Sequence, residues 1–223
     1  MEIKIGISGG TFDPIHIGHI RSAQAAKAAL HLSAVVFVPG GDPPHKLDRR
    51  ILPAADRVEM VRRAIAPEEH FYLSEYETDK EGLSYSVETL RYFHAGGLPE
   101  EVKRLCGPED FFTFYYIIGA DILPELSYWK DAEEVFRLCR FAALMRPGYD
   151  REAFEQNLRE NRRKGATIEF VEMPGVDVSS QEIRRRRLCG LSIAELVPRD
   201  VLAYILEKDL YSKPCLLYTS RCV

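Results

Sequence analysis

Two histidines near the amino terminus carry the chemistry that this sequence points to most directly. His16 and His19 follow an apolar run that leads into the paired glycines Gly9 and Gly10. Glycines have no Cβ atom, so backbone N–H groups can approach phosphate oxygens closely. Imidazoles three residues apart share one face of a helix and can both donate hydrogen bonds to one anion. The segment therefore predicts a site for a nucleotide triphosphate, although a single histidine at a helix start is most often a cap or a surface group.

The C-terminal part of the chain holds a second set of residues that suits phosphate. Ser179 and Ser180 come immediately before a helical pattern, and Arg184 lies one turn into it. Hydroxyls at a helix start either cap its N–H groups or donate to a bound anion, and both alternatives stay open here. A well-aligned arginine adds a charge-assisted contact of about 1.5–3 kcal/mol. The arginines at 185–187 are expected on a solvated face.

Other candidate residues follow predicted strands. The tetrapeptide 43–46 ends in Lys46, and its two prolines either hold this cation on a short rigid arm or form a surface turn. Gly119 and Asp121 come after the most apolar segment, where a carboxylate can accept ribose hydroxyls or cap the next helix. Trp129 is the only tryptophan, and its ring either stacks on a pyridine ring or packs in the core.

Apolar, β-branched runs alternate with helical patterns along the chain. Strands are predicted at 3–8, 34–38, 71–73, 112–118, 141–145 and 167–171. Helices are predicted at 21–30, 53–66, 84–93, 131–138, 151–164, 180–187 and 199–207. This alternation predicts an α/β fold of the Rossmann-like kind, with a doubly wound parallel sheet of five to six strands in a single domain. Ligands of such sheets bind beyond the carboxyl ends of the strands, so the ends at 8–10, 39–41 and 119–121 are expected to share one crevice.

Three local features complete this outline. The helix at 53–66 is expected to carry its arginines on the outer face. Ser84 is the expected cap of the helix at 84–93. The segment 95–110 is rich in glycine, proline and charge, which favours a surface insertion within one domain.

Bulk properties are those of an ordinary globular protein. The 223 residues are 46% hydrophobic and carry a net charge of −4, which gives no argument for nucleic acid or an anionic membrane as partner. No apolar run approaches the roughly 20 residues that span a bilayer, and the first residues lack a signal-peptide pattern. The five cysteines are scattered without zinc-site spacing, which fits a reducing compartment. A cytoplasmic location is therefore expected, and a homo-oligomer stays open because no interface can be read from the sequence.

The end of the chain looks foreign. Residues 215–223 can be encoded by a DNA palindrome that resembles two transposon-end adapters joined back to back. We therefore expect the native domain at 1–214 and a non-native read-through tail at 215–223. A genuine tail is the alternative.

Taken together, the motifs resemble the bacterial nicotinate mononucleotide adenylyltransferases, a family of the nucleotidyltransferase superfamily. The histidine segment matches the superfamily signature Gly-x-Phe-x-Pro-x-His-x-Gly-His, and Val178–Arg184 is similar to its Ile-Ser-Ser-Thr-x-Ile-Arg element. Val178 and Gln181 depart from that element, which has isoleucine and threonine there. The narrower family resemblance comes from the segments 43–46, 84–90, 117–121 and 146–148 and from Trp129.

The resemblance implies adenylyl transfer from ATP to nicotinate mononucleotide, giving deamido-NAD and pyrophosphate in NAD biosynthesis. His16 and His19 would contact the α- and β-phosphates, and Lys46, Ser180 and Arg184 would hold the departing pyrophosphate. Mg²⁺ would arrive with ATP, since no carboxylate cluster suggests a metal site made by the protein alone. The further residues implied in ATP binding are Gly9, Gly10, Thr11, Phe12, Gly119, Asp121 and Ile183.

The same resemblance implies that Ser86, Thr89 and Trp129 surround the nicotinate ring. Family members often carry an aromatic residue after the tryptophan, and Lys130 departs from that pattern. An inward-pointing Lys130 would pair with the nicotinate carboxylate. The sequence does not fix the preference for the acid over the amide.

Other functions stay open. Phosphopantetheine adenylyltransferases have shorter chains without the Pro-Pro-His-Lys and tryptophan elements, and cytidylyltransferases have a different C-terminal signature. Nicotinamide mononucleotide is an alternative acceptor. A tRNA synthetase would need a far longer chain. A catalytically silent nucleotide-binding domain is the alternative from another class, and the intact histidines and Arg184 argue against it.

Overall fold

The computed structural model describes residues 1–41, 51–145, 151–173 and 178–212. Its centre is one sheet of six strands with the order β3-β2-β1-β4-β5-β6, and every neighbouring pair is parallel. The strands are β1 (Glu2–Gly10), β2 (Ala34–Pro39), β3 (Phe71–Leu73), β4 (Phe111–Gly119), β5 (Arg140–Met145) and β6 (Ile168–Glu172). The predicted fold class is confirmed, and each predicted strand agrees with an observed one within two residues at either end.

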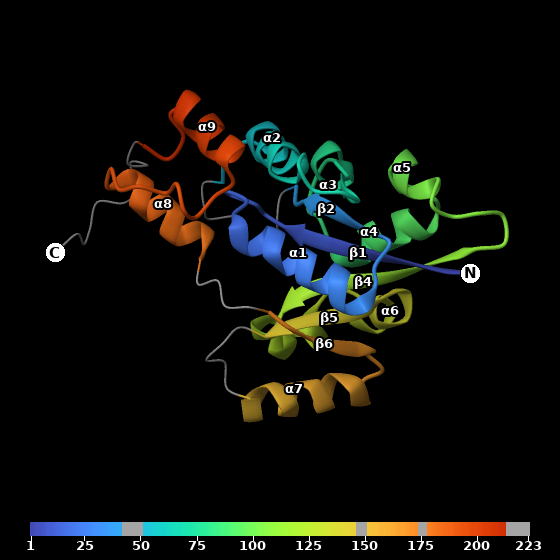
Figure 1. Cartoon of the computed structure of the whole chain (residues 1–223). Coiled ribbons are helices and arrows are strands. Elements are labelled where there is room, and N and C mark those ends of the chain that lie inside the picture. Colours follow the sequence, from blue (N-terminus) through green and yellow to red (C-terminus); the bar gives the residue numbers. More distant parts are fainter. Residues whose placement is uncertain (42–50, 146–150, 174–177, 213–223) are drawn as a thin grey trace.

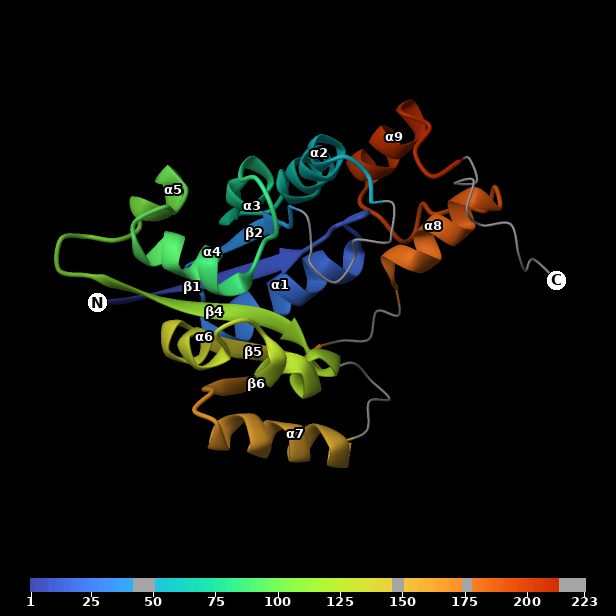
Figure 2. The same ribbon diagram turned by 180° about the vertical axis from the view of Figure 1, so that it is seen from behind.

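Helices cover both faces of this sheet (Figures 1 and 2). They are α1 (Ile17–Leu30), α2 (Ala54–Ile65), α3 (Tyr76–Asp79), α4 (Ser86–His94), α5 (Glu100–Lys103), α6 (Ala132–Leu138), α7 (Arg151–Arg163), α8 (Ser180–Leu188) and α9 (Arg199–Glu207), with the 3₁₀ helix η1 at Ala120–Tyr128. None of the helices in the described ranges is long and apolar enough to cross a membrane.

Several helix predictions were wrong in detail. The helix α1 begins at Ile17 rather than at residue 21. Ser84 does not cap α4, because Tyr85 occupies the cap position and the Ser84 hydroxyl donates to the Glu77 carbonyl at 3.3 Å. The segment 95–110 contains the short helix α5. The helices α3 and η1 were not predicted.

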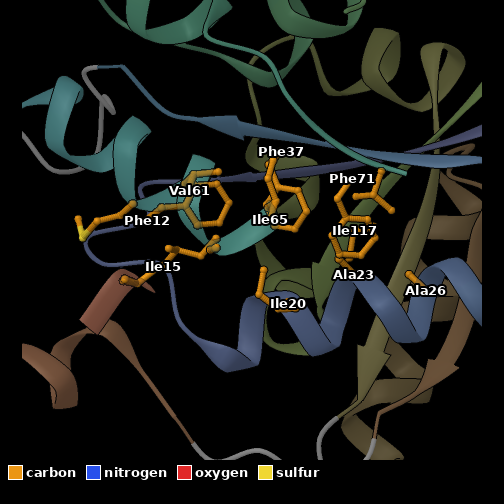
Figure 3. Packing of buried hydrophobic residues seen from close by; sticks show 14 of the residues in the cluster. Phe12, Ile15, Ile20, Ala23, Ala26, Phe37, Val61, Ile65, Phe71 and Ile117 are labelled. Carbon is orange, nitrogen blue, oxygen red and sulfur yellow. The ribbon is translucent and has the colours of Figure 1, made fainter. Parts of the chain in front are cut away.

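The alternation of side chains along each strand divides the core between the two faces. In β2, Val35 and Phe37 belong to the cluster under α1 and α2, whereas Val36 and Val38 belong to the cluster under α4 and α6. Figure 3 shows the first cluster, in which Ala23 of α1 lies near the aromatic rings above it. Burying a large apolar side chain contributes about 1.5–3 kcal/mol, so both faces of the sheet are closed by apolar packing, as a central parallel sheet requires.

The sheet order places a switch point between β1 and β4, because the chain builds outward from β1 in one direction and then in the other. Gly10 at the end of β1 is paired in register with Pro39 at the end of β2. The Gly40 N–H then donates to the Gly10 carbonyl at 2.8 Å. Both views place α8 and α9 at the end of the sheet away from the amino terminus (Figures 1 and 2). The strand ends at which the sequence predicts a crevice therefore lie at the same end of the molecule as α8.

Candidate active site

The two histidines form a stacked pair at the start of α1. His16 is the cap residue, 4% exposed, and His19 lies in the first turn of the helix. Their ring centroids are 3.6 Å apart with an interplanar angle of 24°. The His16 backbone N–H donates to His19 Nδ1 at 3.2 Å. An accepting Nδ1 carries no proton, so neutral His19 holds its proton on Nε2 and can donate it to an anion.

The turn before the histidines is shaped by apolar anchoring. Phe12 is 2% exposed and has a positive φ of 49°, and its ring lies edge-on to His19 with centroids 5.0 Å apart. Gly18 is needed where the chain before α8 crosses α1, since a Cβ atom there would lie 2.9 Å from Val178 Cγ1. The first turn of α1 holds no acidic residue, so its positive end faces this turn uncompensated by a carboxylate of its own.

The start of α8 is attached to the residues just before the histidines. Ser179 caps the helix, because its hydroxyl accepts from the Glu182 N–H at 3.1 Å. Ser180 Oγ donates to the Pro14 carbonyl at 2.9 Å. Arg184 Nη1 donates to the Asp13 carbonyl and lies 3.9 Å from Asp13 Oδ2. Ser179 is thus the cap, whereas Ser180 binds the histidine turn. Donation from these hydroxyls to a bound anion stays a prediction.

A buried arginine that the sequence analysis placed on an outer face lies under this turn. Arg57 is 2% exposed. Its guanidinium donates to the carbonyls of Thr11 at 2.8 Å and Gly40 at 2.6 Å, and also to those of Leu52 and Gly41. The prediction of outward-facing arginines was therefore wrong for this residue. Arg57 and Val61 are four residues apart on one side of α2, and this helical spacing was the signal that could have placed it on the buried face.

A second group of candidate site residues contains hydroxyls and a carboxyl. Thr89 is fully buried, and its hydroxyl donates to Glu77 Oε1 at 2.5 Å. Ser86 Oγ donates to Tyr116 Oη at 3.2 Å. Glu77 is 8% exposed, and burial raises the pKa of its carboxyl. No sequence signal marked Glu77, because it lies in a four-residue helix without a readable period.

Trp129 is half-buried beside this cluster. Its ring lies edge-on to Tyr116 and Phe141, with centroids 5.5 Å and 6.3 Å away. Lys130 does not point to this space: its ammonium lies 3.1 Å from Glu88 Oε1 and 4.0 Å from the centroid of the Tyr85 ring. The idea of an inward-pointing Lys130 is therefore not supported by its contacts.

The remaining predicted residues do not contact either of these groups through any bond described above. Asp121 is exposed at the start of η1. Its Oδ1 lies close to Gly119, where a Cβ atom would be only 2.2 Å from it. Ile183 is fully buried and anchors α8 in the core. Lys46 lies outside the described residues, as do its neighbours at 43–45 and the segment 146–148. In the described part of the chain, no three His, Cys, Asp or Glu side chains gather where they could hold a metal ion.

Comparison with known proteins gives the family. A family model described as cytidylyltransferase-like matches residues 7–186. A protein of Thermoanaerobacter sp. (strain X514) called "Probable nicotinate-nucleotide adenylyltransferase" is 37% identical over 213 residues, covering 95% of this chain and 96% of its own. A protein of Clostridium perfringens (strain SM101 / Type A) with the same name is 38% identical, covering 94% and 98%. The chain belongs to the nicotinate-nucleotide adenylyltransferase family.

Solved structures agree with the architecture of this adenylyltransferase. The Plasmodium falciparum nicotinic acid mononucleotide adenylyltransferase complexed with NaAD matches with a TM-score of 0.72 at 19% identity, covering 94% of this chain and 97% of that one. The same enzyme complexed with APC matches with a TM-score of 0.70 at 18% identity. At these identities the likeness concerns the fold alone.

The structure thus joins some of the predicted residues directly and leaves others apart. The histidine turn of this adenylyltransferase meets Ser180 and Arg184 through the Asp13 and Pro14 carbonyls. Ser86 and Trp129 both contact Tyr116, while Thr89 contacts Glu77. Arg57, Glu77 and Tyr116 are the residues that sequence reasoning missed. Arg57 and Glu77 link the two groups, since both lie against Gly40 and Gly41, which follow β2.

Proposed function

We propose that this protein transfers the adenylyl group of ATP to nicotinate mononucleotide, giving deamido-NAD and pyrophosphate. The observation that carries the proposal is the stacked pair of His16 and His19 at the start of α1, with Arg184 bound to the turn before it. This places directed N–H donors and a guanidinium at one end of a parallel sheet, where a polyphosphate can be bound.

The reaction needs positioning more than acid–base catalysis. An oxygen of the mononucleotide phosphate attacks the α-phosphorus of ATP in line, and the bond from that phosphorus to the oxygen bridging to the β-phosphate breaks. The attacking oxygen is already anionic, so no base has to remove a proton. Negative charge develops on the leaving pyrophosphate, and donors aimed at those oxygens lower the barrier.

The phosphate contacts are assigned to the histidine side of the crevice. His19 Nε2 donates to an α- or β-phosphate oxygen, because its Nδ1 is occupied by the His16 N–H. His16 and Arg184 complete this set, and Ser180 is proposed to join it by exchanging its Pro14 carbonyl partner for a phosphate oxygen. Lys46 is proposed as a further cation on the pyrophosphate. Backbone groups of residues 9–12, together with Gly119, Asp121 and the backbone of Ile183, are proposed to contact the rest of ATP.

Mg²⁺ is proposed to enter with ATP, and it would neutralise part of the charge of the phosphates. The donor set around the histidines suits an anion, since it consists of imidazoles and a guanidinium. Asp13 adds a carboxylate there, but its oxygens face Tyr211 and Arg184.

The acceptor is assigned to the side of the crevice that holds Ser86, Thr89 and Trp129. Trp129 packs edge-on against Tyr116 and is half-buried. A pyridine ring could therefore lie against the exposed part of its indole ring. The family relationship supports nicotinate mononucleotide in preference to its amide.

The test is an ATP-dependent pyrophosphate assay with three acceptors. Nicotinate mononucleotide should give the highest kcat/KM, followed by nicotinamide mononucleotide, with phosphopantetheine inactive. A preference for phosphopantetheine would assign the protein to another adenylyltransferase activity. Binding of ATP without pyrophosphate release with any acceptor would instead indicate a silent nucleotide-binding domain.

The functional unit is proposed to be residues 1–214, with 215–223 contributing nothing to the reaction. The curated relatives support this extent, since the alignment with the Thermoanaerobacter protein covers 96% of that protein. A chain ending at residue 214 should match the full chain in kcat/KM and Tm.

A further inference from the structure

We propose that Asp13 and Tyr211 form a positioning pair that orients the Arg184 guanidinium toward the polyphosphate. The inference rests on the proposed function of Arg184 and extends it to two residues that the sequence analysis did not single out. It makes the turn after α9 part of the active site, although Tyr211 lies 198 residues from Asp13 in the chain.

The contacts divide the two oxygens of the Asp13 carboxylate. Tyr211 Oη donates to Oδ1 at 2.7 Å, while Oδ2 faces Arg184 Nη1 at 3.9 Å. Asp13 is only 6% exposed, so little solvent competes for these oxygens. The Tyr211 hydrogen bond therefore fixes the carboxylate rotation that leaves Oδ2 toward the guanidinium.

The arginine is held without being neutralised by a close ion pair. Its Nη1 donates to the Asp13 backbone carbonyl, and the carboxylate lies at the outer limit of an ion pair. Its side chain stays 34% exposed. Because one guanidinium nitrogen makes both contacts with Asp13 and the side chain is partly exposed, we infer that phosphate oxygens can accept from the other N–H groups.

Tyr211 is suited to act as a permanent donor. Burial, followed by the nearby Asp13 charge and the hydrogen bond to it, raises the pKa of its phenol well above the ordinary value. The hydroxyl thus keeps its proton over the pH range in which enzymes are assayed.

Folding does not depend on this bond alone. The Ile17 N–H donates to the Leu196 carbonyl at 3.1 Å, and Ser180 binds the Pro14 carbonyl. Val201 and Ile205 of α9 are fully buried in the core. Removing one hydroxyl should therefore leave the C-terminal segment in place while changing the carboxylate that faces Arg184.

The chain offers a matched control. Tyr204 also donates its hydroxyl to an aspartate, Asp56 Oδ1, at 2.8 Å, and this bond joins α9 to α2. Tyr204→Phe and Tyr211→Phe each remove one tyrosine–aspartate hydrogen bond between the C-terminal segment and the rest of the chain. Only Tyr211→Phe alters a group that faces Arg184.

The experiment compares both variants with the wild type in binding and in turnover. Titration calorimetry measures the Kd of pyrophosphate and of ATP, and steady-state assays give KM for each substrate. Tyr211→Phe should raise the Kd of pyrophosphate and of ATP about five- to tenfold, the scale of one hydrogen bond. The KM for nicotinate mononucleotide should stay unchanged. Tyr204→Phe should leave all four constants unchanged at a similar change in Tm.

A double-mutant cycle then tests the pair itself. In Asp13→Asn, the amide oxygen can still accept from Tyr211, and the NH₂ group then faces Arg184. This variant should therefore raise the Kd of pyrophosphate more than Tyr211→Phe does. The double variant should bind pyrophosphate no more weakly than Asp13→Asn, because the phenol acts through the carboxylate.

Two results would overturn the pair: equal constants for the two tyrosine variants, or a parallel rise in KM for both substrates that indicates general loosening. Failure of the proposed function gives a different pattern. If the wild type does not use nicotinate mononucleotide but Tyr211→Phe still weakens pyrophosphate, the positioning pair stands and the assigned acceptor is wrong.

Discussion

The two groups of proposed site residues are held in place by different kinds of bond. In the group proposed to bind the phosphates, here called the phosphate side, side chains bind the backbone: Arg57 binds the Thr11 carbonyl, Arg184 the Asp13 carbonyl and Ser180 the Pro14 carbonyl. In the group proposed to bind the pyridine ring, here called the pyridine side, side chains bind one another: Thr89 binds Glu77, and Ser86 binds Tyr116.

This difference has a physical consequence. A backbone carbonyl is present whatever residue occupies the position, so a side chain bound to it needs only the right chain path. A pair of side chains needs both residue types at once. The phosphate side also contains the cationic side chains of Arg57 and Arg184, whereas the pyridine side contains the buried Glu77 carboxyl, whose charge costs free energy.

The largest effect that would sharpen this comparison concerns His19. His19→Ala removes a directed donor from the phosphate side and should lower kcat about 10²-fold, the scale of one lost oxyanion donor, with the fold intact. Pyrophosphate release under saturating substrates measures it, and circular dichroism checks the fold.

The control is at the other end of the same helix. His31 is exposed and has φ of 53°, a conformation that asparagine tolerates. His31→Asn should retain wild-type kcat. Near-normal turnover by His19→Ala would remove His19 from the mechanism and leave the phosphate side without its main donor.

The next effect tests whether backbone-bound arginine supports the phosphate side. Arg57→Lys leaves several buried carbonyls without a donor, because one ammonium cannot reproduce the guanidinium fork. We expect the free energy of unfolding to fall by about 2 kcal/mol, together with a rise in KM for ATP. Denaturant unfolding and steady-state kinetics measure both.

Arg62→Lys is the matched control on α2. Arg62 has a side chain that is 51% exposed and pairs with Glu59 and Glu75, and a lysine can keep such surface contacts. Its stability should stay within about 0.5 kcal/mol of the wild type. Equal losses for both variants would show that burial of Arg57 has no special effect.

These same residues mark what the sequence could predict. The parallel sheet followed from alternating periods, and the histidine turn followed from residues that are adjacent in the chain. Arg57 and Arg62 are chemically identical, so only their angle around α2 separates a buried clamp from a surface ion pair. Glu77 could not be found, because its partner Thr89 lies 12 residues away across a helix too short to show a period.

The pH dependence of stability sharpens the contrast on the pyridine side. Burial raises the pKa of Glu77 in the folded protein. The protonated Glu77 carboxyl therefore makes its full contribution to stability below the unfolded-state pKa of about 4.3. That contribution is lost as pH rises through the folded-state pKa. Glu77→Gln keeps an acceptor for Thr89 but cannot ionise. The variant should therefore gain stability relative to the wild type as pH rises from 4 to 8, measured by Tm at each pH.

A surface carboxylate gives the opposite sign. Its hydrogen bond to Arg91 lowers the pKa of Glu134, so its contribution is present above the unfolded pKa and is lost as pH falls through the lowered folded value. Glu134→Gln should lose stability relative to the wild type over the same rise in pH. If Tm changes with pH in the same direction for both variants, relative to the wild type, then burial does not disfavour the ionised form of Glu77.

The smallest effect concerns Lys130, which borders the pyridine side without entering it. Its ammonium is bound to Glu88 and lies over the Tyr85 ring, and its side chain is 44% exposed. An exposed pair of this kind contributes little to stability, and the pairing of the ammonium with Glu88 leads us to expect no contact with the acceptor. Lys130→Met should therefore leave KM for nicotinate mononucleotide within about twofold of the wild type, as should Lys103→Met, which breaks a surface pair with Glu100. A tenfold rise for Lys130→Met alone would mean that Lys130 leaves Glu88 and binds the acceptor carboxylate, so that the pyridine side would share the cationic character of the phosphate side.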